Sequence, residues 1–128
     1  TCPIYDMTLR PDGSFTLYGE RFVKETGVQE GTLGPEAWEQ ATDALRSANF
    51  WSVAARQTPD TLQNCHTDAP TARVTWRTEE GREKTLTYDA GCGVRKTQNL
   101  IIALREALQF EDLVWTDREF PFDPGPPR

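Results

Sequence analysis

Residues 71–89, TARVTWRTEEGREKTLTYD, contain two runs in which apolar and polar side chains alternate. Alternation with a period of two is typical of strands that have one buried and one solvated face. Residues 79–82 lie between the runs and are mostly charged, which is typical of a turn. The stretch therefore predicts a β-hairpin whose buried positions are Ala72, Val74, Trp76, Leu86 and Tyr88.

The segments on either side of this hairpin have the spacing of helices. After it, Gly91, Cys92 and Gly93 break the strand pattern, and a helix is expected over 94–109. Before it, a helix is expected over 35–49, because proline suits a first helical turn and apolar residues recur every three or four positions. The predicted buried stripes are Trp38, Ala41, Leu45 and Ala48 in the earlier helix and Leu100, Ile101, Leu104 and Leu108 in the later one.

The N-terminal segment has the pattern of a second hairpin. Its turn is Pro11–Gly13, in which proline presets the first turn position and glycine can adopt the left-handed conformation. Weaker strands are expected around 21–24 and 28–32, and would continue the sheet as a meander with one of them at an edge. The apolar positions that alternate with polar ones around the turn are Tyr5, Met7, Leu9, Phe15 and Leu17.

The order of these elements, strands, helix, two strands and helix, predicts an α+β fold. We expect a two-layer sandwich in which both helices cover one face of an antiparallel sheet. Residues 1–110 would form this single domain, and residues 111–128 an extended, Pro-rich C-terminal tail.

Composition and charge exclude some classes of partner. The chain has 128 residues with 20 acidic and 14 basic side chains, a net charge of −6. Binding to nucleic acid needs a positive surface, so no nucleic-acid partner is expected. No apolar run approaches the roughly 18 to 20 residues that a membrane-spanning helix needs. No cofactor is expected either.

The three cysteines, Cys2, Cys65 and Cys92, have neither the spacing of a CxxC redox pair nor that of a zinc knuckle. Cys65 and Cys92 could form a disulfide that closes the long polar connection before the hairpin, and such a bond would contribute roughly 3 to 4 kcal/mol. The alternative is three reduced, buried cysteines in a cytoplasmic protein. Cys2 is either a free thiol or paired with a residue upstream.

An ordered series of short motifs resembles a bacterial family of uncharacterised domains whose members open with a C-x-G-x-CP-x-Y motif. In this chain the first cysteine of that motif would lie upstream of Thr1, where a secretion signal and a lipid-acceptor cysteine would also lie. The resemblance covers roughly residues 1–108. The matching segments are Cys2 to Tyr5, Pro11 to Gly13, Tyr18 to Glu20, Phe22-Val23, Gly27 to Leu33, Asn49 to Trp51, Thr67 to Thr71, and Gly91-Cys92.

The resemblance implies a compartment and no reaction. Members are mainly exported proteins and lipoproteins of the bacterial envelope, so it implies a periplasmic or outer-membrane-anchored domain with another envelope protein as the expected partner. It also favours an oxidised Cys65–Cys92 pair. No catalytic residue of the family can be carried over to this sequence.

One enzymatic hypothesis follows from His66, the only histidine, which lies beside Cys65 and two residues before Asp68. With Cys92 at the start of the last helix as nucleophile and His66 as base, the chain would be a cysteine-dependent hydrolase. A bonded cysteine and a solvated histidine are the commoner outcome in an exported domain. A zinc site formed by Cys65, His66 and Cys92 is disfavoured, because the first two are adjacent in sequence.

Binding is the preferred function. A disulfide-tethered turn could present His66 and Asp68 to a partner, although turn chemistry alone also explains the segment. Trp38 and Trp76 are expected to face each other in the core, whereas Trp51 and Trp115 could line a groove. We therefore expect a non-enzymatic protein-binding or accessory module, with the hydrolase and a periplasmic small-ligand carrier as alternatives.

Overall fold

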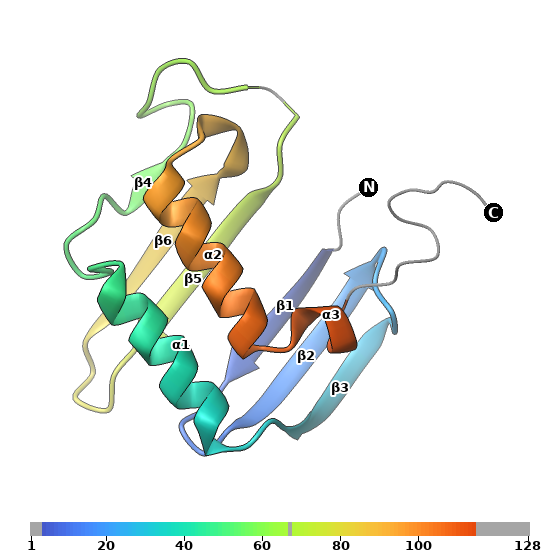
Figure 1. Ribbon diagram of the computed structural model, residues 1–128. Coiled ribbons are helices and arrows are strands. Elements are labelled where there is room, and N and C mark those ends of the chain that lie inside the picture. Colours follow the sequence, from blue (N-terminus) through green and yellow to red (C-terminus); the bar gives the residue numbers. More distant parts are fainter. Residues whose placement is uncertain (1–3, 67, 115–128) are drawn as a thin grey trace. The chain divides into compact units, whose positions relative to one another are not determined.

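The computed structural model describes residues 4–66 and 68–114 and has the expected α+β class, with antiparallel strands and helices (Figure 1). One of the helices, η1 (Ala90–Cys92), is a single 3₁₀ turn. In chain order the elements are β1 (Ile4–Leu9), β2 (Ser14–Arg21), β3 (Gly27–Thr32), α1 (Pro35–Ser47), β4 (Arg56–Gln57), β5 (Thr71–Arg77), β6 (Glu83–Asp89), η1 (Ala90–Cys92), α2 (Arg95–Ala107) and α3 (Phe110–Leu113).

The chain divides into two compact units, and the boundary passes through α1 and α2. The N-terminal unit contains described residues 4–44 and 102–114, and the middle unit contains residues 45–101. Each unit has its own three-stranded sheet, where the sequence analysis expected one sheet for the whole domain. Each unit is therefore described by itself.

In the N-terminal unit the strand order is β1-β2-β3, and both pairs are antiparallel. The predicted hairpin around Pro11–Gly13 is confirmed, and the Gly13 amide donates to the Arg10 carbonyl oxygen at 2.8 Å. Phe15 and Leu17 lie on the inner face of the sheet and pack with Val114, which follows α3 (Figure 1). This small cluster is the hydrophobic core of the sheet.

In the middle unit the order is β4-β6-β5, and the predicted hairpin of β5 and β6 is confirmed. The short strand β4 runs parallel to β6 and was not expected from the sequence. Leu86 and Phe50 are fully buried, and Tyr88 is 2% exposed. The Tyr88 hydroxyl donates to the side-chain oxygen of Gln98 at 3.1 Å, which fixes the first half of α2 against β6.

Three boundaries differ from the predictions. The strand expected around 21–24 is wrong, because Phe22 has a left-handed φ of 55° and ends the extended backbone. Helix α1 ends at Ser47, two residues before the end of the expected range 35–49, and Asn49 follows it with a left-handed φ of 54°. Residues 110–113 form α3, so the tail does not begin at residue 111, and the rest of it from residue 115 lies outside the described residues.

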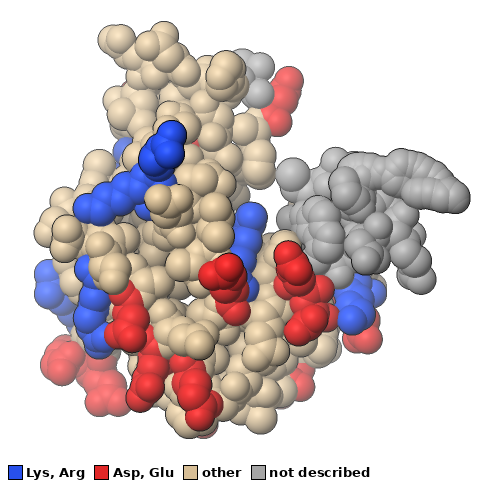
Figure 2. Space-filling view, in the orientation of Figure 1, with Lys and Arg blue, Asp and Glu red and all other residues tan. Residues whose placement is uncertain are grey.

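The two units differ in charge. The described part of the N-terminal unit contains eleven acidic and four basic side chains, a net −7, whereas the middle unit contains six acidic and eight basic ones, a net +2. Figure 2 shows acidic side chains along α1 and near α3. The acidity of the chain is thus concentrated in the N-terminal unit.

Replacing Gly13 by alanine should destabilise the N-terminal hairpin. Gly13 has a φ of +89°, and a Cβ there would lie 2.0 Å from the carbonyl oxygen of Gly34, which is backbone and cannot rotate away. We expect the free energy of unfolding to fall by more than about 2 kcal/mol in urea denaturation. Gly27→Ala is the matched control in the same unit, since Gly27 has a φ of +93° with open space around it, and it should lose only about 1 kcal/mol. Equal losses would refute the steric explanation.

Candidate functional site

The connection between β4 and β5 contains Cys65, His66 and Asp68, three of the residues that the sequence predicts as candidate site residues. Its first part is a polar turn in which the Thr58 amide donates to the Thr61 hydroxyl at 3.2 Å and that hydroxyl donates to the Arg56 carbonyl oxygen at 3.0 Å. Asp60 accepts a hydrogen bond from the Thr58 hydroxyl and pairs with Arg56 at 3.2 Å. The hydroxyl of Thr58 lowers the pKa of the Asp60 carboxyl, so this carboxylate stays charged and structural at neutral pH.

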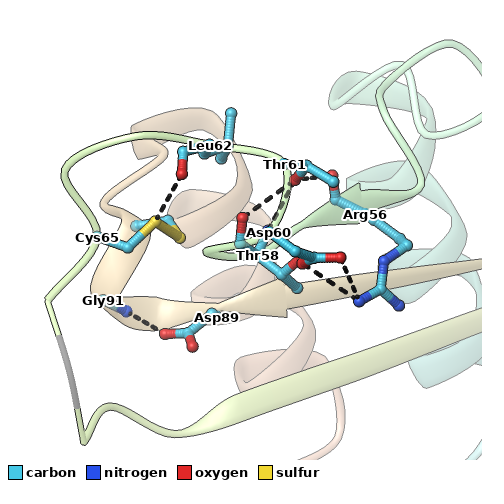
Figure 3. The surroundings of a disulfide bond; sticks show 9 residues. Arg56, Thr58, Asp60, Thr61, Leu62, Cys65, Asp89 and Gly91 are labelled. Atoms are coloured by element: carbon cyan, nitrogen blue, oxygen red, sulfur yellow. Dashed lines mark hydrogen bonds and ion pairs between the residues drawn. A yellow bond between two sulfur atoms is a disulfide. The ribbon is translucent and has the colours of Figure 1, made fainter.

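The second part of the connection is held by a disulfide bond between Cys65 and Cys92 (Figure 3). Two backbone hydrogen bonds follow it within the loop that it closes: the His66 amide donates to the Gly91 carbonyl oxygen at 2.8 Å, and the Ala90 amide donates to the Pro70 carbonyl oxygen at 2.9 Å. Cys65, His66 and Pro70 are thus fixed to η1 by one covalent and two hydrogen bonds. We call residues 65–70 the tethered loop.

Gly91 lets the tethered loop approach η1 this closely. A Cβ at this position would lie 2.3 Å from the His66 carbonyl oxygen and 3.1 Å from the Cβ of Ala69. The Gly91 amide donates to the side chain of Asp89 at 2.8 Å, which caps η1. Only glycine fits between these groups without moving the loop.

The tethered loop exposes the two residues that were expected to contact a partner. His66 and Asp68 are both exposed, and Asp68 has a left-handed φ of 64°. Neither side chain makes a hydrogen bond or an ion pair with another residue that the structure describes. Their polar groups are therefore available to a binding partner, while Thr67 between them lies outside the described residues.

The hydrolase hypothesis loses its nucleophile in this state, because a sulfur bonded to another sulfur carries no thiolate. The expected position of Cys92 is also corrected. Cys92 ends η1, and Gly93, with a φ of 62°, separates it from α2, which begins at Arg95. Cys92 therefore does not lie in the first turn of α2, where a helix dipole would lower the pKa of its thiol.

Trp51 belongs to an aromatic cluster in the middle unit. Its ring stacks on that of Trp76 at 5.0 Å between centroids, and the guanidinium carbon of Arg82 lies 4.1 Å from its ring centroid. Phe50 contacts both tryptophans edge to face. Trp51 is half-buried in this cluster. Trp38, expected opposite Trp76, is only half-buried.

Cys2 and Trp115 lie outside the described residues. Within residues 4–66 and 68–114, no three His, Cys, Asp or Glu side chains are grouped so that they could hold a metal ion. None of the described helices has the length and apolar content to cross a bilayer.

A disulfide-containing α+β domain with a tethered surface loop is the class of protein that this fold defines. Residues 1–109 match the model of a family described as a domain of unknown function, DUF6438, and the chain belongs to this family. No curated protein and no solved structure matches the chain.

Two features of the loop were missed by sequence reasoning. The sequence indicates Gly91 only as a chain break, and its close approach to His66 cannot be inferred from one sequence. The pairing of Ala90 with Pro70, directly before the strand that starts at Thr71, was missed as well. Both depend on contacts between segments about 20 residues apart.

Removing the disulfide should destabilise the middle unit. The double substitution Cys65→Ser with Cys92→Ser should lower the free energy of unfolding by about 3 kcal/mol, because the bond joins residues 27 positions apart and restricts the unfolded chain. Urea denaturation followed by tryptophan fluorescence measures this loss.

Reductant provides the control for this prediction. It should lower the stability of the wild type by a similar amount and leave the double variant unchanged. A wild type whose denaturation midpoint does not respond to reductant would show that the bond is not formed in solution.

Proposed function

We propose that this chain is an exported bacterial domain that acts by binding another protein of the cell envelope, as a non-enzymatic or accessory module. The disulfide that tethers residues 65–70 is the observation that carries the proposal. The bond supports export, because structural disulfides persist outside the cytosol. It supports binding, because it fixes the loop backbone before a partner associates.

The compartment follows from redox chemistry. Structural disulfides form and persist in the periplasm and at the cell surface, whereas cytosolic thiols are kept reduced. The resemblance of the opening and later motifs to exported and lipoprotein-like domains supports the same compartment. A lipid anchor upstream of Thr1 is part of the proposal.

The binding role follows from the construction of the loop. A segment that is ordered before association loses less conformational entropy on binding than a free loop. The loop fixes its own backbone through Cys65, His66 and Pro70, and it leaves the side chains of His66 and Asp68 exposed. An imidazole and a carboxylate two residues apart suit recognition of a polar protein surface.

The same geometry favours binding over catalysis. A general base is normally held by a hydrogen bond from a second group and lies within reach of a nucleophile. His66 has no such hydrogen bond to a described residue, and the sulfur of Cys92 is engaged in the disulfide. The exposed polar groups of the loop fit a contact surface better than a reaction centre.

The compartment is tested in cells that express the protein from its complete gene. We expect it in the periplasmic or membrane fraction, and alkylation with a maleimide polymer before reduction should leave Cys65 and Cys92 unmodified. Alkylation after reduction should modify both. Recovery in the cytosol with Cys65 and Cys92 accessible before reduction would overturn the export proposal.

The binding role is tested by affinity capture from envelope extract. The wild type should recover a partner that His66→Ala with Asp68→Ala recovers at least about fivefold less, because the loop would lose both exposed polar groups. The matched control is Glu79→Ala with Glu80→Ala, two exposed carboxylates in the turn between β5 and β6. Equal recovery with all three proteins would remove the loop from the proposal.

A further inference from the structure

Strand β3 is an edge strand. Within the described ranges its only neighbour in the sheet is β2, and five of its six residues are exposed. Edge strands of native proteins are often protected by lysine, proline or a bulge. Strand β3, with the sequence GVQEGT, has no lysine or proline, and its register with β2 is regular from Gly27 to Thr32.

The register shows which backbone groups lie on the open edge. The Leu33 amide donates to the Gly13 carbonyl oxygen at 2.8 Å, which continues the β2–β3 pairing as a hydrogen-bonded pair. Hydrogen-bonded and non-hydrogen-bonded pairs alternate along an antiparallel ladder. The amides and carbonyls of Val28, Glu30 and Thr32 therefore point away from β2, towards the open edge.

An apolar pair accompanies these backbone groups. Val28 is 70% exposed and Tyr18, its direct partner on β2, is 47% exposed. Directly opposed residues lie on the same face of a sheet, and those of a non-hydrogen-bonded pair lie closest together. Tyr18 and Val28 thus form a small exposed apolar patch beside the open edge, on the face of the sheet opposite to Phe15 and Leu17.

The charges around this pair are mainly negative. Asp6 is opposite Tyr18 on β1, Glu20 follows two residues later on β2, and Glu30 follows Val28 on β3. Of the cations in this unit, Arg10 donates to the hydroxyls of Ser14 and Thr16, and Lys24 donates to the Asp112 carbonyl oxygen. Arg21 lies three residues after Tyr18 on β2, opposite Ile4, so three carboxylates face one nearby cation. The surface would therefore attract a basic partner.

A second copy of the chain is a poor occupant of this edge. The N-terminal unit carries a net charge of −7 over its described residues, so pairing two such units edge to edge would bring like charges together. A basic segment of another protein has the complementary charge.

We propose that the open edge of β3 receives an extended, basic segment of a partner protein, which adds a strand to the sheet. Backbone hydrogen bonds to Val28, Glu30 and Thr32 would provide the affinity. An apolar residue of the segment would pack on Val28 and Tyr18, and a lysine or arginine two positions away would face Glu30. The inference rests on the proposed role as a protein-binding module, but it uses a different surface from the tethered loop.

The probe for this proposal is a fluorescein-labelled eight-residue peptide in which lysine and valine alternate at every second position, with threonine between them, so that one face of the strand carries both a valine and a lysine two positions apart. It is titrated into the full chain and followed by fluorescence anisotropy. We expect saturable binding that weakens as salt is added. A second peptide, N-methylated at every second amide on its pairing edge, keeps the charge but cannot form the strand, and should bind about tenfold more weakly.

Two protein variants distinguish binding of the peptide at the β3 edge from its attraction to the overall negative charge of the unit. Glu30→Lys should weaken binding of the first peptide about fivefold or more, whereas Glu39→Lys, on the exposed side of α1, makes the same change in net charge and should have a much smaller effect. The His66→Ala and Asp68→Ala double variant should bind the peptide like the wild type. Because this variant lacks the polar groups of the loop and keeps the β3 edge, its binding of the peptide tests the edge proposal independently of the loop proposal.

Hydrogen exchange measured by NMR locates the peptide. Binding should slow exchange of the Val28 and Glu30 amides and leave that of Gln29, which points towards β2, unchanged. The proposal is overturned if the N-methylated peptide binds equally well, or if Glu30→Lys and Glu39→Lys have the same effect. It is also overturned if the protein alone sediments as a dimer with the Val28 and Glu30 amides already protected, since a second copy would then occupy the edge.

Discussion

The covalent bond between Cys65 and Cys92 constrains a connection that has little else to hold it. Residues 58–70 are polar, and only Thr58 among the described ones is fully buried, so hydrophobic burial contributes little to their order. The bond brings the connection to η1, and the hydrogen bonds of His66 to Gly91 and of Ala90 to Pro70 then form over a short distance. Strand β5 starts directly after these contacts, so the same constraint also sets where the hairpin begins.

The regular elements were predictable because each depends on local periodicity. The hairpin of β5 and β6 follows from alternation, and α1 follows from apolar spacing between Pro35 and Asn49. Strand β4 was missed because two residues, Arg56 and Gln57, carry no periodic signal, and its parallel pairing with β6 is decided by tertiary contacts. Division into two sheets was missed for the same reason, since alternation identifies a strand but not its partners.

The candidate site was predictable only in part. Sequence patterns identified His66 and Asp68 as exposed loop residues, but the disulfide was one of two alternatives until the resemblance favoured it. The pairing of Trp51 with Trp76 and Arg82 could not be predicted, because a single tryptophan outside a periodic element has no signal for its neighbours. The open edge of β3 was within reach of sequence reasoning: Leu17 faces inwards, so Tyr18 must face outwards, and Val28 was already placed in a weak strand that was one candidate for the edge.

The two proposed surfaces recognise a partner by different physical means. The tethered loop offers side chains on a backbone that is already fixed, so its selectivity would depend on the positions of His66 and Asp68. The edge of β3 offers backbone groups that any extended chain can pair with, and discrimination there would come from Val28, Tyr18 and Glu30. The loop belongs to a unit with a net charge of +2 and the edge to a unit with a net charge of −7, so basic segments would be directed to the edge rather than to the loop. The two proposed contacts therefore require partner segments of different charge and conformation, one recognised by fixed side chains and the other by backbone pairing.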